Sequence, residues 1–130
     1  MATFTIRDAQ LAAFRQERIR SFVDDMVAYI ASEYPTHHAR LGEEGTRAFV
    51  ERTMEAARAL RIQTQGAIGA LVELRLMFGE QLERAPDRQW ARKILAHKTL
   101  PDYIRVGAVQ ERMSERTGGR VLVVHQEEPA

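Results

Sequence analysis

The sequence contains no cysteine, only one tryptophan, and lysine at only two of its 130 positions, Lys93 and Lys98. The lack of cysteine excludes disulfides, thiolate nucleophiles and thiolate metal sites together. A chain of this length can bury roughly two-thirds of the surface that its unfolded form exposes, so it can fold without such cross-links. Apolar residues make up 45% of the chain and charged residues 28%, which is typical of a water-soluble globular protein.

Long apolar runs are also missing. The most apolar stretch, Ala67–Phe78, is interrupted by Gly69, Glu73 and Arg75, and it falls short of the roughly 20 residues that cross a bilayer. The first residues do not show a basic start followed by an apolar core, which a secretory signal requires. We therefore expect a cytoplasmic protein.

The chain has little net charge. It carries 19 Lys and Arg residues against 18 Asp and Glu residues, and the two signs are interleaved along its length. Such a chain has no net field that would attract a nucleic acid or an anionic membrane, so we expect neither as a partner.

The pattern of apolar residues predicts a long first helix over residues 8–34. Its stripe-forming residues recur at steps of three and four: Leu11, Phe14, Arg18 or Ile19, Phe22, Met26 and Ile30. Val23 and Val27 widen this stripe. Pro35 is expected to end this helix, because the residue before a proline is pushed out of helical geometry.

The rest of the chain predicts further helices. We expect one short helical turn over 36–41 with Gly42 as its stop, and longer helices over 43–60, 64–79, 87–97 and 102–116, with Asp87 as the cap of the fourth. The helix over 64–79 is apolar almost all round, which indicates burial. The predicted fold is all-α: a single-domain bundle of about five helices over 1–119, followed by an extended tail over 120–130.

The tail departs from this pattern. Its run Val121, Leu122, Val123 and Val124 is typical of a β-strand, and the remaining chain offers no strand to pair with. Three interpretations stay open: packing along the helices, which is the simplest, pairing with a strand of another protein, or disorder. The second would make these four residues a protein-binding site.

Motifs for catalysis or metal binding are not evident. The serines lack a Gly-x-Ser-x-Gly setting, and the adjacent His37 and His38 diverge on a helix by about 100°. The paired acidic residues, such as Asp24-Asp25, diverge in the same way and read as a solvated face. We therefore expect no enzyme activity, no cofactor and no metal.

Trp90 is a second candidate for protein binding. Aromatic side chains are often the residues that dominate an interface. However, Trp90 lies at helical spacing with Ala91, Ile94 and Leu95, and this pattern more often belongs to a core. We favour the core interpretation and keep Trp90 as a candidate interface residue.

Several short stretches resemble a group of small bacterial proteins encoded in type VI secretion effector loci. These stretches are Phe4-Thr5-Ile6-Arg7 with Gln10 and Phe14, Tyr34-Pro35 followed by Leu41-Gly42, Met77-Phe78-Gly79, and Trp90-Ala91 with Ile94-Leu95. They cover most of the chain up to Leu95 in the same order, and none of them is a catalytic motif. The tail from Arg120 departs from the group.

The resemblance implies a non-catalytic accessory role beside a secreted toxin. The chain would act as an adaptor or chaperone that binds a secreted effector or spike component, or as an immunity protein that neutralises a cognate toxin. It implies no particular binding residues. From another class, a small DNA-binding regulator remains the alternative, and the long first helix or the tail would also allow a homodimer.

Overall fold

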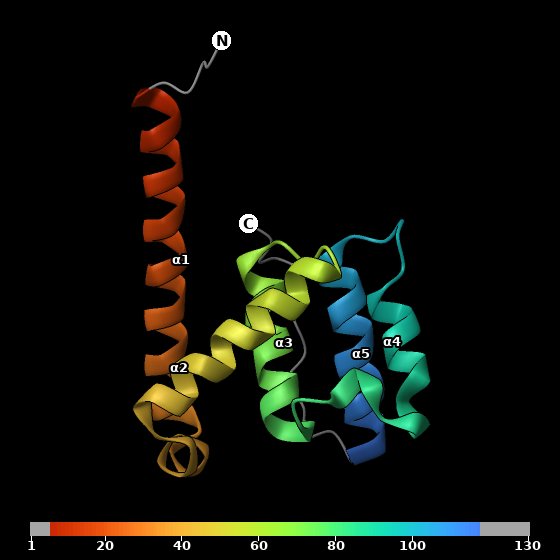
Figure 1. The fold of residues 1–130 in the computed structure, drawn as a ribbon. Helices are drawn as coiled ribbons and strands as arrows, with labels where there is room; N and C mark the ends of the chain where they lie inside the picture. The colour runs from red at the N-terminus through yellow and green to blue at the C-terminus, as the bar shows by residue number, and fades with distance from the viewer. Residues whose placement is uncertain (1–5, 118–130) are drawn as a thin grey trace. The chain divides into compact units, whose positions relative to one another are not determined.

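The computed structural model describes residues 6–117 and shows five α-helices and no strand among them. The helices are α1 (Ile6–Glu33), α2 (Pro35–Ala59), α3 (Gln65–Phe78), α4 (Gln89–Leu95) and α5 (Asp102–Thr117) (Figure 1). Two 3-10 turns, η1 (Leu82–Arg84) and η2 (Pro86–Arg88), join α3 to α4. The predicted all-α fold with its long first helix is confirmed. The tail over 120–130 lies outside the described residues.

The chain divides into two compact units, and the division falls after Val50, inside α2. In the first unit, the stripe predicted for α1 is buried at Val23, Met26, Val27 and Ile30. An ion pair joins the two helices of this unit, because Arg47 Nη2 on α2 lies 2.6 Å from Asp24 Oδ1 on α1.

Gly42 interrupts α2 within the first unit, as the sequence predicted. Its φ of 79° and ψ of 170° lie outside helical geometry, in a region that is essentially restricted to glycine. Helical geometry resumes after Gly42, and the Thr46 Oγ1 donates to the carbonyl oxygen of Gly42 at 2.7 Å. This break lets residues 35–41 and the remainder of α2 run in different directions.

Replacing Gly42 with alanine is expected to lower the free energy of unfolding by about 1–2 kcal/mol, because a Cβ is strained at this positive φ. Gly107 is a matched control on α5. It lies inside a helix with no atom within 4 Å of a built Cβ, so Gly107→Ala should instead stabilise the protein by about 0.5–1 kcal/mol. Urea unfolding of both variants measures the two effects, and equal effects of one sign would contradict this account of Gly42.

In the second unit, α3 is a largely buried helix, as its sequence predicted. The Thr64 side chain caps its first turn by accepting from the N–H of Ala67, and Gly79 follows its last residue. Its neighbour α5 also packs against α4 (Figure 1). The buried apolar residues of this core come from α2, the α2–α3 loop, α3, η1, α4 and α5: Ala57, Ile62, Ala67, Ala70, Leu71, Leu74, Leu82, Ala91, Leu95, Val106, Val109 and Met113.

The start of α4 differs from the prediction. Asp87 does not cap this helix, because Pro86 begins the 3-10 turn η2 and Asp87 lies inside it. Arg88 occupies the N-cap position of α4 and makes no side-chain capping bond. The fixed φ of proline favours the first position of a helical turn, and this shifts the helix start by two residues.

Candidate functional site

Of the predicted site residues, only Trp90 lies within the described part of the chain. Its ring is half-buried and packs against the core of the second unit. The guanidinium carbon of Arg112 lies 4.5 Å from the centre of the ring, within the range of a cation–π interaction. Trp90 therefore contributes to the edge of the core, and its role at an interface stays a prediction. Val121–Val124 lie outside the described residues.

Residues 15–21 of α1 form a solvent-exposed segment. Every side chain from Arg15 to Ser21 is exposed, and Ile19, a member of the predicted apolar stripe, is 44% exposed. The same stripe is buried from Val23 onward. A stripe that is covered along only part of its length leaves apolar surface available for a partner.

A second feature is polar and lies at the start of α5. Asp102 accepts hydrogen bonds from the backbone N–H of Gln63 at 2.6 Å and of Thr64 at 2.8 Å, and from the Thr64 hydroxyl at 3.1 Å. All three donors belong to the end of the α2–α3 loop, so the carboxylate lies at the N-terminus of α3. It also lies in the first turn of its own helix. Negative charge is favourable at both positions because they carry the positive ends of helix dipoles.

These bonds determine the acidity of Asp102. Burial alone would raise the pKa of its carboxyl group, but the hydrogen bonds from Thr64 and Gln63 outweigh burial and hold the pKa below its ordinary value. Asp102 is therefore an anion at neutral pH, and its charge stabilises the loop that precedes α3.

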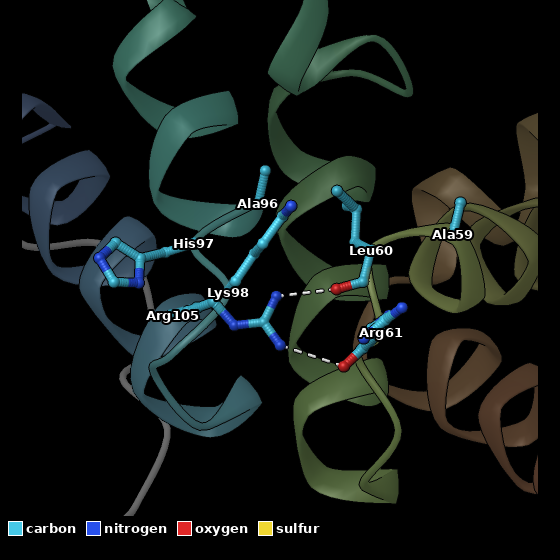
Figure 2. Close-up of a pocket in the computed structure, with 7 residues that line it drawn as sticks. All are labelled: Ala59, Leu60, Arg61, Ala96, His97, Lys98 and Arg105. Carbon is cyan, nitrogen blue, oxygen red and sulfur yellow. Dashed lines mark hydrogen bonds between the residues drawn. The ribbon is translucent and has the colours of Figure 1, made fainter.

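One turn later, Arg105 forms hydrogen bonds with the start of the same loop. Its Nη1 donates to the carbonyl oxygens of Leu60, at 2.8 Å, and Leu95, and its Nη2 donates to that of Arg61 at 3.0 Å (Figure 2). Its Nε donates to the carbonyl oxygen of Leu100 at 3.0 Å. The residue is only 5% exposed, so this is a buried cation that is satisfied by backbone carbonyls.

The acceptors explain how a cation is tolerated there. Leu60 and Arg61 follow the last residue of α2, and Leu95 is the last residue of α4. The carbonyls at the ends of helices carry partial negative charge and need donors. Asp102 and Arg105 therefore bind different partners. Asp102 lies at helix N-termini, which carry partial positive charge, and Arg105 lies at helix C-termini, which carry partial negative charge. We call Asp102 and Arg105, together with the groups on residues 60–64 that they bind, the α5 clamp.

A pocket of about 300 Å³ adjoins the α5 clamp. It is lined by Arg105, by three further basic residues and by small or apolar side chains: Ala59, Leu60, Arg61, Ala96, His97, Lys98 and Arg105. Figure 2 shows the Arg105 guanidinium directed toward Leu60 and Arg61, while the imidazole of His97 points away from Leu60. The Nδ1 of His97 lies 3.4 Å from the backbone nitrogen of Thr99, which holds the ring on that side.

A buried ion pair lies elsewhere in the second unit. Arg75 on α3 is 6% exposed, its Nη2 lies 3.5 Å from Glu83 Oε2, and its Nη1 donates to the Thr53 hydroxyl at 3.2 Å. Arg75 Nε and Glu83 Oε1 are buried and have no hydrogen-bond partner among the described residues. Thr53, Arg75 and Glu83 belong to α2, α3 and η1, so this buried pair connects these three elements.

The α5 clamp was not predicted from the sequence. Asp102 and Arg105 precede Val109 and Met113 at helical spacing, so both lie on the buried stripe of α5. A charged residue on an apolar stripe is the signal that could have identified them, since buried charges require partners. On the same helix, Ile104 is 38% exposed and Tyr103 packs against the core.

Within residues 6–117, no group of three or more His, Asp or Glu side chains is placed to bind a metal ion. Over the same range, no helix combines the length and the apolar character needed to cross a bilayer. Comparison of the chain with protein-family models, curated proteins and solved structures found no match.

Proposed function

We propose that this protein is a non-catalytic protein-binding module and that the exposed segment of α1, residues 15–21, is its binding surface. The observation that carries the proposal is the change along α1: the stripe is buried from Val23 to Ile30, whereas Ile19 on the same stripe is 44% exposed. An amphipathic helix that lays its apolar face against a partner uses residues at this spacing.

The neighbouring charges support a protein partner. Around Ile19, α1 carries both signs, with Arg20 Nη1 only 2.8 Å from Glu17 Oε1 and with Asp24 paired to Arg47. A mixed rim of this kind around an apolar centre is typical of protein interfaces. A nucleic-acid surface would instead need a basic stripe.

The resemblance of several stretches to proteins of type VI secretion effector loci supports a more specific proposal. In this proposal the chain is a cytoplasmic adaptor or chaperone, and its partner is a secreted effector or a spike component. The near-neutral net charge favours an adaptor that binds an apolar segment over an immunity protein, which usually presents charge complementary to the toxin's site.

Affinity capture from the native cell lysate tests the proposal. Wild-type protein is expected to enrich one effector or spike component, and Ile19→Asp should abolish that enrichment, because a charge at the centre of an apolar contact must be desolvated. Ile104→Asp is the matched control: Ile104 has the same side chain, is 38% exposed and belongs to the second unit. It should retain the partner.

Two results would contradict the proposal. If Ile19→Asp captured the partner as well as Ile104→Asp does, α1 would not be the binding surface. If genomic DNA were retained at low salt and no protein were enriched, the DNA-binding alternative would replace it. Deletion of Val121–Val124 in the same assay measures whether the tail contributes.

A further inference from the structure

We propose that the pocket beside Arg105 binds a small oxyanion of the phosphate type. This inference concerns the second unit and does not depend on the partner of α1. Three of its seven lining residues carry a positive charge, namely Arg61, Lys98 and Arg105, and none is acidic. In a chain with nearly equal numbers of both signs, this is a local concentration of positive charge.

The ends of α2 and α4 do not cancel this charge. Their terminal carbonyls at Leu60, Arg61 and Leu95 would oppose an anion if they were open to the pocket. Each of them instead accepts a hydrogen bond from Arg105. The clamp therefore neutralises the helix ends and leaves Arg61 and Lys98 as the exposed cations of the lining.

Arg105 also retains a donor for a ligand. A guanidinium group has five N–H groups. The bonds to Leu60, Leu95, Leu100 and Arg61 use four of them, and the remaining one, on Nη2, has no acceptor among the described residues. Because Arg105 is 95% buried and lines the pocket, a bound anion would supply the acceptor that this buried donor lacks.

The backbone of Arg61 is a separate indication. Its φ of 60° makes it the only non-glycine residue with positive φ among residues 6–117. Glycine or asparagine adopts this conformation at a helix end with less strain. The N–H groups of Ile62 and Arg61 donate to the carbonyl oxygens of Ala57 and Arg58, so this conformation is the capped end of α2, and an arginine at this position places a cation at the rim of the pocket.

The arrangement of donors favours phosphate over carboxylate. Recognition of a planar carboxylate by arginine uses two parallel N–H groups, and Arg105 has only one left. Lysine binds phosphate as a point charge. A tetrahedral anion would offer separate oxygens to Lys98, to Arg61 and to the last N–H of Arg105. A pocket of about 300 Å³ is at the small end of ligand sites and accommodates such a group.

NMR titration of the full chain with inorganic phosphate, at constant ionic strength, tests the proposal. We expect saturable shifts of the amide signals of residues 59–61 and 96–105. Lys98→Gln should weaken binding about tenfold, the loss that corresponds to one charge-assisted hydrogen bond. Lys93→Gln is the matched control, because Lys93 is also exposed and lies on α4 outside the lining. It should leave the affinity unchanged.

A second arm identifies the source of the phosphate group. Glycerol 3-phosphate that binds as tightly as inorganic phosphate would show that the group alone is recognised, and tighter binding would indicate a phosphorylated small molecule. Equal affinity for acetate and phosphate would overturn the assignment to phosphate. Shifts that are absent, or that weaken equally in Lys98→Gln and Lys93→Gln, would overturn the site itself.

Discussion

Arg105→Met is expected to lower the free energy of unfolding by about 3–5 kcal/mol. Four carbonyl oxygens lose their donor, and each buried polar group without a partner costs about 1–3 kcal/mol. Water that enters from the adjoining pocket restores part of this loss, so the total stays below the sum of four full penalties. Urea unfolding followed by circular dichroism measures the change.

Two further variants make this prediction specific. Arg105→Lys should recover only part of the stability, because an ammonium group has three donors and cannot reach all four carbonyls as a planar fork. Arg58→Met is the control: the Arg58 side chain is 80% exposed, and its ion pair with Glu55 spans 3.9 Å at the surface. It should change stability by less than about 0.5 kcal/mol. A loss at Arg105→Met no larger than at Arg58→Met would show that the clamp does not stabilise the fold.

Asp102→Ala is expected to lower the free energy of unfolding by about 2–3 kcal/mol at neutral pH. The backbone N–H groups of Gln63 and Thr64 lose a charged acceptor, and the first turns of α3 and α5 lose a favourable negative charge. Asp102→Asn should cost less, because its amide oxygen can still accept from the backbone.

The dependence on pH follows from the lowered pKa of Asp102. A carboxyl group whose pKa is lower in the folded than in the unfolded chain contributes stability above its unfolded pKa, which is about 4, and loses it as the pH falls through the folded value. Wild-type protein should therefore lose more stability than Asp102→Asn when the pH is lowered from 7 to below about 4. Equal losses in the two proteins would contradict the assignment of this stability to Asp102.

Most of the fold could be predicted because its signals are local. The spacing of Val23, Met26 and Ile30 predicts the buried side of α1, and residues this close in sequence share a helix face in any tertiary arrangement. Gly42, Thr64 and Gly79 act on the backbone next to them, so the break in α2 and both ends of α3 were also predictable. The start of α4 was missed by two residues because two turn signals, Pro86 and Asp87, competed there.

The sequence by itself therefore determined the helices and their order, the buried side of α1 from Val23 onward, and both ends of α3. The tertiary structure alone decided the α5 clamp and its pocket. Asp102 meets Gln63 and Thr64 across 39 and 38 residues, and Arg105 meets Leu60 and Arg61 across 45 and 44. No periodicity of a single helix encodes such a contact, because it forms only when packing of α3 and α4 against α5 brings helix ends together. The physical reason is the need of buried charges and helix ends for partners, which only the folded chain can supply.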